Sequence, residues 1–270
     1  MNESTNSASP KVFCIANQKG GVGKTTTAVN LAAGLAQQGK QVLLVDLDPQ
    51  GNATMGSGID KSTRVINLYH VLIDHEPLEQ AVIRSPEGGY DVLPSNRELS
   101  GAEIDLVPMD ARERQLGNAI KNSKLKYDYV LIDCPPTLSL LTLNGLAAAN
   151  GVIIPMQCEY FALEGLSDLV NTIKRVYRNI NPKLDLIGLL RVMFDSRVTL
   201  QQQVSTQLED HFKEKVFSTV IPRNVRLAEA PSYGLPGIVY DKSSRGAKAY
   251  LAFAEELIAR VEIDQKTESI

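Results

Sequence analysis

A glycine-rich octet near the amino terminus has the residue types that bind phosphate. It reads K-G-G-V-G-K-T-T and runs from Lys19 to Thr26. Glycines let backbone N–H groups close around an anion with no Cβ in the way, and a helix start adds the positive end of its dipole. Lys24 would contact the phosphates, and the Thr25 hydroxyl would hold Mg²⁺. The candidate nucleotide-binding residues here are Lys19, Gly20, Gly21, Val22, Gly23, Lys24, Thr25 and Thr26.

The octet departs from the usual phosphate-loop pattern at its first positions. In G-x-x-x-x-G-K-[ST] the first glycine would fall at Gln18, and in this chain a lysine follows that position. A single lysine is most often a solvated surface charge. Beside three phosphates, however, a second ammonium has an electrostatic role. Lys19 is therefore a candidate catalytic residue together with Lys24.

The segments on either side of the octet have strand and helix patterns. The apolar run at residues 12–16 predicts a buried strand, and periodic apolar positions from Ala28 to Ala36 predict a helix. Strand, glycine loop and helix are the order that a phosphate loop requires. The octet therefore stands in the context that its chemistry needs.

Two further apolar runs end in carboxylates. Residues 41–46 end at Asp46, with Asp48 two positions further, and residues 127–133 end at Asp133. Open α/β sheets bind ligands at the carboxyl ends of their strands. Asp133 is thus a candidate for the magnesium shell, with a helix cap or a turn as the alternative. For Asp48 the residues alone favour neither a catalytic role nor the turn that D-P-Q-G would form.

Strand and helix patterns alternate along the rest of the chain without an internal repeat. Further strands are expected at residues 90–94, 151–155, 184–193 and 215–220, and helices at residues 68–74, 112–121, 162–180, 199–212 and 245–261. Such alternation predicts a doubly wound α/β fold, a mostly parallel sheet with helices on both faces. We expect one domain over residues 11–270, preceded by a disordered tail of residues 1–10.

Composition and charge narrow the class of protein. The 270 residues, of which 43% are hydrophobic, suffice for one large core. No apolar run reaches the length of a membrane span, and the polar amino terminus lacks the order of a signal peptide. Three scattered cysteines have neither disulfide nor metal spacing, which indicates a reducing, cytoplasmic compartment. The net charge is −3, but residues 191–248 hold nine Lys/Arg and six Asp/Glu, which fits a solvated surface as well as a DNA-binding face.

Four motifs spread over most of the chain resemble those of one family. They are the octet, D-L-D-P-Q-G-N at residues 46–52, D-C-P-P at residues 133–136 and I-P-R-N at residues 221–224. Together they resemble the ParA/Soj partition ATPases, in the wider group with a deviant Walker A loop that includes MinD and the nitrogenase iron protein. The resemblance implies a P-loop NTPase fold that binds ATP and Mg²⁺ and hydrolyses ATP.

The resemblance also implies roles for single residues of the phosphate site. Two subunits would close on ATP as a sandwich homodimer, with Lys24 and Thr25 acting in their own subunit and Lys19 reaching the partner's phosphates. Asp48 would position the attacking water. Asp133 would belong to the shell of the metal ion.

The carboxyl-terminal third would contact the base and DNA. The resemblance places Pro222 and Asn224 at the adenine, and an asparagine has the donor and acceptor to read its edge. From the residues alone, residues 221–232 are an ordinary connecting loop. Two arginines match DNA contacts of the family, although each could equally be a solvated or ion-paired side chain. The candidate DNA-binding residues are Arg197, Arg226 and Arg245.

The implied function is segregation of DNA, with hydrolysis as the switch. The ATP dimer would bind double-stranded DNA without sequence choice on the nucleoid, and a ParB-like centromere-binding protein would stimulate hydrolysis and release it. A MinD-like membrane switch is an alternative, but the tail at residues 262–270 is short and acidic. A metabolic ligase of the dethiobiotin-synthetase kind is another. The cysteines do not suit an iron–sulfur reductase, and a carrier that positions a different cargo would have the same ATPase.

Overall fold

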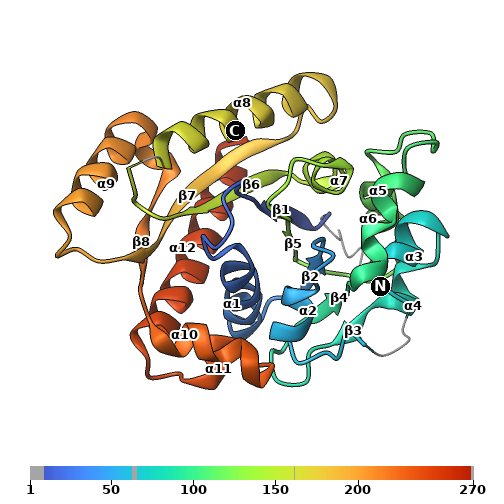
Figure 1. Cartoon of the computed structure of the whole chain (residues 1–270), viewed down its shortest axis with the longest axis horizontal. Coiled ribbons are helices and arrows are strands. Elements are labelled where there is room, and N and C mark those ends of the chain that lie inside the picture. Colours follow the sequence, from blue (N-terminus) through green and yellow to red (C-terminus); the bar gives the residue numbers. More distant parts are fainter. Residues whose placement is uncertain (1–8, 63–65, 161, 269–270) are drawn as a thin grey trace, which may run out of the picture.

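The computed structural model describes residues 9–62, 66–160 and 162–268, and most of the expected tail at residues 1–10 lies outside them. Their strands form one eight-stranded sheet in the order β3-β4-β2-β5-β1-β6-β7-β8 (Figure 1). All neighbouring strands pair in parallel except β3 and β4. The predicted doubly wound, mostly parallel α/β fold is confirmed. The strands are β1 (Lys11–Ile15), β2 (Val42–Asp46), β3 (Ile83–Arg84), β4 (Asp91–Leu93), β5 (Tyr129–Asp133), β6 (Gly151–Met156), β7 (Asp185–Phe194) and β8 (Val216–Pro222).

Helices cover both faces of this sheet. The α-helices are α1 (Lys24–Gln37), α2 (Asn52–Gly56), α3 (Leu68–Ile73), α4 (Leu78–Ala81), α5 (Ala102–Asp105), α6 (Gln115–Asn122), α7 (Leu140–Ala148), α8 (Ala162–Asn179), α9 (Thr199–Phe212), α10 (Val225–Glu229), α11 (Gly237–Tyr240) and α12 (Arg245–Glu268). Short 3₁₀ turns are η1 (Arg97–Ser100), η2 (Lys213–Lys215) and η3 (Ala230–Tyr233). None of the described helices is long and apolar enough to cross a membrane.

The alternation of side chains along each strand divides the core in two. In β1, Val12 and Cys14 point into one cluster, whereas Phe13 and Ile15 point into the other. Helices α3 to α9 complete the first cluster, and α1, α2 and α10 to α12 complete the second. Figure 1 shows α7 and α8 on one side of the strands and α1 with α12 on the other. The strands read as continuous apolar runs because both of their faces are buried.

The first and the last long helices pack against each other beneath the sheet. The Thr27 hydroxyl and the Tyr250 hydroxyl lie 3.0 Å apart and share a hydrogen bond. A Cβ at Gly34 would lie only 2.9 Å from the Cβ of Ala254, so α1 and α12 approach closely at that glycine. The backbone N–H of Ile238 donates to Asn30 on α1 at 3.0 Å. The helix that follows the octet is therefore held by the carboxyl-terminal end of the chain.

The pairing between edge strand β8 and its neighbour β7 is interrupted by a shift in register. Leu189 lies opposite Val216, but Arg191 lies opposite Val220, so residues 217–219 bulge out of the ladder. A side chain from α12 caps this bulge, since the Glu256 carboxylate accepts hydrogen bonds from the N–H groups of Ser218 at 2.7 Å and Thr219 at 2.8 Å.

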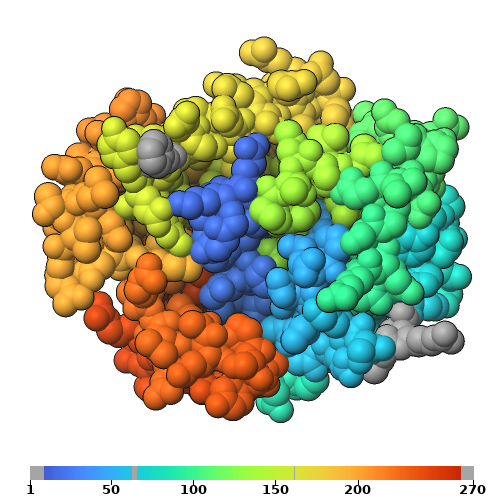
Figure 2. Space-filling view, in the orientation of Figure 1, coloured from blue at the N-terminus to red at the C-terminus, as the bar shows by residue number. Residues whose placement is uncertain are grey.

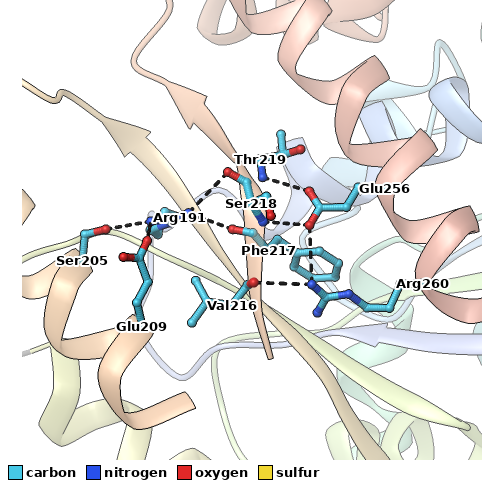
Figure 3. A network of polar contacts seen from close by, with 9 residues as sticks. All are labelled: Arg191, Ser205, Glu209, Val216, Phe217, Ser218, Thr219, Glu256 and Arg260. Carbon is cyan, nitrogen blue, oxygen red and sulfur yellow. Dashed lines mark hydrogen bonds and ion pairs between the residues drawn. The ribbon is translucent and has the colours of Figure 1, made fainter. Parts of the chain in front are cut away.

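Two arginines complete the network around this bulge (Figure 3). Arg191, buried on β7, donates to the Phe217 carbonyl at 2.8 Å and forms an ion pair with Glu209 on α9. The Arg260 guanidinium lies over the Phe217 ring, 4.0 Å from its centroid, and donates to the Ile187 carbonyl at 3.0 Å. The polar groups that the broken ladder leaves unpaired are thus bound by side chains from β7 and α12.

Two parts of the sequence-based expectation were wrong or incomplete. Residues 221–232 do not form an ordinary loop but contain α10 and most of η3, because Asn224 caps α10 by accepting from the Leu227 N–H at 3.4 Å. Helix α7 was not expected. Its apolar run is buried along most of its length, and its polar Asn144 is itself buried, where it donates to the Arg112 and Leu140 carbonyls at 2.8 and 3.0 Å.

Candidate nucleotide site

The octet connects the carboxyl end of β1 to the first turn of α1. Gly21 and Gly23 have φ angles of +72° and +78°, which side-chain-bearing residues rarely adopt. Gly23 is the N-cap of α1, and the first turn of α1 carries no acidic residue. Val22, 1% exposed, anchors the loop in the core. The positive end of the α1 dipole therefore faces the loop without a carboxylate of its own first turn.

The Lys24 side chain is folded into the loop. It is 8% exposed, and its Nζ donates to the Lys19 carbonyl oxygen at 3.1 Å. Burial lowers the pKa of Lys24, and the charges of Asp133 and Asp48 counteract that shift. A buried ammonium at the start of a helix is suited to neutralise phosphate oxygens.

Thr25 and Asp133 meet under the loop, although 108 positions separate them in the sequence. The Thr25 hydroxyl donates to Oδ2 of Asp133 at 2.7 Å, while Oδ1 is buried and has no hydrogen-bond partner among the described residues. Burial raises the pKa of Asp133 well above its usual value, and the charge of Asp46 raises it further. Hydroxyl and carboxylate oxygens are the ligands that Mg²⁺ prefers, and a divalent cation would satisfy the orphaned oxygen. The residues fit the expected metal ion.

The sheet brings the three acidic strand-end residues to one edge. Asp133 at the end of β5 lies opposite Ile15 of β1 and opposite Asp46 of β2. Asp48 follows on the loop, half-buried, and its Oδ1 accepts from the Gln50 N–H at 2.9 Å. This hydrogen bond closes the turn that the D-P-Q-G pattern predicts. The same carboxylate is near enough to Lys24 to affect its pKa, so the turn also places Asp48 beside the phosphate loop.

Asp46 has partners that the sequence did not reveal. It is fully buried, and its Oδ2 accepts from both the N–H and the hydroxyl of Thr54 on α2, each at 2.7 Å. Burial raises the pKa of Asp46 to about 6, and the bonds from Thr54 oppose that rise. The strand pattern shows only that an acid ends β2, because its partner lies on a helix too short to give a periodic signal.

The segment after β6 forms a second wall of the loop. Gln157 donates from Nε2 to the Gly21 carbonyl at 3.1 Å, and Asn17 donates to the Pro155 carbonyl at 2.9 Å. Lys19, the unusual lysine of the octet, forms an ion pair with Glu159 in its own chain. Both of these charged side chains are about half exposed, at 52% and 47%. No motif around residues 155–159 marks this role.

The first part of the octet lies at the surface, since Lys19, Gly20 and Gly21 are exposed. In Figure 2 the amino-terminal segment, in blue, reaches the surface in the middle of this face, between the orange-red carboxyl-terminal part and the green and cyan parts. On the orange-red side, Pro222 ends β8, and Asn224 uses its carbonyl oxygen to cap α10. Its amide N–H groups remain as donors for a ligand.

The three candidate DNA-binding arginines lie on different elements. Arg197, 88% exposed, binds Asp195 through Nε at 2.9 Å and a terminal nitrogen at 2.7 Å. These bonds are the main cause that lowers the pKa of Asp195, and the charge of Arg245, at the start of α12, lowers it further. Arg226 on α10 donates to Glu229 at 3.0 Å. Arg197 and Arg245 therefore share one acidic neighbour, whereas Arg226 pairs with Glu229 and, at 3.5 Å, with Asp241.

Comparison with known proteins assigns the family. A model described as an AAA domain matches residues 10–186. The chromosome-partitioning ATPase Soj of Thermus thermophilus is 53% identical over 93% of this chain and 96% of its own length. The sporulation initiation inhibitor protein Soj of Bacillus subtilis is 51% identical over 92% and 98%. A crystal structure described as cobyrinic acid a,c-diamide synthase from Mycobacterium smegmatis, with bound ADP and magnesium, is 38% identical with a TM-score of 0.82, covering 94% of this chain and 96% of that one. With these relatives and with the four motifs in place on one sheet edge, the chain belongs to the ParA/Soj family of chromosome-partitioning ATPases.

Proposed function

We propose that this chain is the nucleotide switch of a DNA-partitioning system. It forms a dimer and binds DNA while it holds ATP, and it releases the DNA after hydrolysis. As a member of the ParA/Soj family it is an ATP hydrolase, with ATP as substrate and Mg²⁺ as cofactor. The single observation that carries the site assignment is the Thr25–Asp133 hydrogen bond, with its orphaned carboxylate oxygen, directly under the phosphate loop.

We infer a task in hydrolysis for each residue of this site. The loop N–H groups and Lys24 would bind the phosphates, and Thr25 with Asp133 would hold Mg²⁺, which neutralises charge on the phosphate oxygens. Asp48 would position a water molecule for attack on the γ-phosphorus, which breaks the bond to the β-phosphate oxygen and leaves ADP and phosphate. Asn224, with Pro222, would contact the adenine.

Dimer formation and DNA binding extend this proposal beyond one chain. Lys19 is exposed enough to reach a second subunit, but it would first have to leave Glu159. In the ATP dimer Arg197, Arg226 and Arg245 would bind DNA phosphates from both subunits. A ParB-like protein on its own DNA site would stimulate hydrolysis and reset the dimer, on the nucleoid in the cytoplasm.

Replacement of Lys24 tests the nucleotide site itself. Lys24→Ala removes the cation buried in the loop, so measurable ATP binding should be lost, together with every later step. Titration with a fluorescent ATP analogue measures this. Lys40→Ala is the matched control, because Lys40 pairs with Glu262, an acid on α12 outside the loop, at 3.6 Å. Unchanged ATP affinity in Lys24→Ala would refute the phosphate-loop assignment.

A metabolic ligase is the second candidate function, and the description of the Mycobacterium smegmatis structure as a diamide synthase favours testing it. A ligase needs no DNA and no protein partner for turnover. Sedimentation with and without ATP and with and without nonspecific duplex, together with an assay of phosphate release, separates the two candidates. An ATP-dependent dimer that sediments with DNA supports partitioning, whereas rapid turnover by a monomer that ignores DNA supports the ligase.

A further inference from the structure

The loop that carries Asp48 needs a fixed position if this carboxylate is to orient water. Misplacement of a catalytic group by about 1 Å can cost on the order of 100-fold in rate. Asp48 itself is only half-buried, and its Oδ1 is bound within its own turn. The side chain of Asp48 therefore does not fix the loop, and the constraint has to come from contacts of the loop backbone.

A chain of hydrogen bonds, closed by a direct bond from the Asp48 N–H to Oδ1 of Asp46 at 3.3 Å, supplies that constraint. Oδ2 of Asp46, at the rigid end of β2, accepts from the N–H and the hydroxyl of Thr54, each at 2.7 Å. The Thr54 hydroxyl oxygen in turn accepts from the Ser95 N–H at 3.0 Å. The Ser95 hydroxyl donates to the carbonyl oxygen of Asp48 at 2.7 Å. The path thus starts and ends on the two acids of the D-L-D motif.

Burial makes this chain of bonds stiff. Asp46, Thr54 and Ser95 are 0%, 0% and 1% exposed, so water does not compete for their polar atoms. Gly51, with φ at +63°, closes the loop against the same segment, because a Cβ there would lie 2.8 Å from the Ser95 carbonyl oxygen. Its N–H also donates to the Asp48 carbonyl at 2.9 Å. The backbone carbonyl of Asp48 is therefore bound from two directions.

We propose that Asp46, Thr54 and Ser95 are positioning residues for ATP hydrolysis, which hold Asp48 where it orients the attacking water. None of the three need touch the nucleotide. The inference rests on the proposed role of Asp48, and it explains why Asp46 is buried in the core without an ion pair to any residue that the structure describes. It predicts that loss of one link in the chain slows the chemical step and leaves ATP binding intact.

Variants that each remove one link test the proposal. Thr54→Val replaces the hydroxyl by a methyl group of similar size, and Ser95→Ala removes only the bond to Asp48. We expect kcat to fall at least about tenfold in both, with KM and ATP affinity within about twofold of the parent. Thr54→Ser keeps the hydroxyl and should restore kcat. Ser57→Ala is the matched control, since this buried hydroxyl, at the carboxyl-terminal cap of the same helix, bonds Tyr90 at 2.8 Å, away from the loop.

A double-mutant cycle with Asp48→Ala separates positioning from stability. If Thr54 acts through Asp48, Thr54→Val should cause no further loss of kcat in the Asp48→Ala background. A parent-like kcat in both Thr54→Val and Ser95→Ala, or losses that multiply with that of Asp48→Ala, would overturn the positioning role alone. If Asp48→Ala itself hydrolyses ATP at the parent rate, the proposed role of Asp48 fails, and the positioning role falls with it.

Discussion

The three aspartates at the carboxyl ends of β2 and β5 differ in what surrounds their carboxylates. Asp133 has an orphaned oxygen under Thr25, which suits a metal ion. Asp46 accepts two bonds from Thr54 on one oxygen and one bond from the Asp48 N–H on the other, which suits a structural anchor. Asp48 is half-buried at the mouth of the loop, which suits contact with water. Burial and hydrogen-bond partners therefore suit these three similar carboxylates to different tasks.

The role of Asp48 gives a prediction at the scale of one residue. Asp48→Ala removes a carboxylate that orients water but no phosphate ligand, so ATP should stay bound while hydrolysis falls by about 100-fold or more. A single-turnover assay with labelled ATP, together with an equilibrium binding titration, measures both. Hydrolysis at the parent rate would show that the Asp48 side chain only stabilises its turn and does not orient water.

Lys19 gives a second prediction, because its ion pair with Glu159 leaves it at the entrance of the loop. Lys19→Ala should retain ATP binding, since Lys24 and the loop N–H groups remain, but should not form the ATP dimer. Sedimentation velocity with and without ATP measures this, with Lys40→Ala as the control. If Lys19→Ala forms the ATP dimer as tightly as the parent, Lys19 has no role in the contact between subunits.

At the scale of elements, the sequence predicts those strands, helices and loops whose residues form a local pattern. The central strands were recognised because burial on both faces makes them apolar runs, and the octet was recognised because phosphate binding constrains adjacent residues. Helix α7 was missed because it is too deeply buried to show a polar face, and the two-residue β3 is too short for a pattern. Gln157 and Glu159 reach the loop from about 140 positions away, so only the fold brings them there.

The capped bulge of β8 gives a prediction about stability. The Glu256 carboxylate can accept the N–H groups of Ser218 and Thr219 on separate oxygens, whereas an amide has one oxygen. Glu256→Gln should therefore lower the free energy of unfolding by about 1–3 kcal/mol. Urea denaturation measures this change, and Glu255→Gln, an exposed neighbour on α12, should remain within about 0.5 kcal/mol of the parent. Equal stability of the two variants would mean that water replaces Glu256 at the bulge.

At the scale of the whole molecule, DNA binding should depend on the nucleotide and on salt. A dimer doubles the basic side chains that face one duplex, so binding should appear only with ATP and weaken steeply as salt rises. Arg197→Ala and Arg226→Ala should each weaken binding to all sequences alike and reduce the salt slope by about 1 per lost phosphate contact. Biosensor titrations at two salt concentrations measure both effects.

The control for this experiment is an ion-paired arginine elsewhere on the sheet. Arg84 on β3, at the edge opposite β8, pairs with Asp91 at 2.9 Å, so Arg84→Ala removes a comparable surface charge. Its DNA affinity should match that of the parent. If Arg197→Ala and Arg226→Ala also hold DNA as tightly as the parent, their ion pairs with Asp195 and Glu229 are surface contacts only, each worth at most about 1 kcal/mol to folding.

The contact between α1 and α12 has a consequence for biosynthesis. The ribosome makes α1 before the partners of this helix, because Ile238 and Tyr250 lie more than 200 positions after the α1 residues that they contact. Until α12 has emerged, α1 has no apolar surface to pack against on that side. We therefore expect the helix of the phosphate loop to become fully packed only after the whole sheet has been made, because all eight strands precede α12 in the sequence.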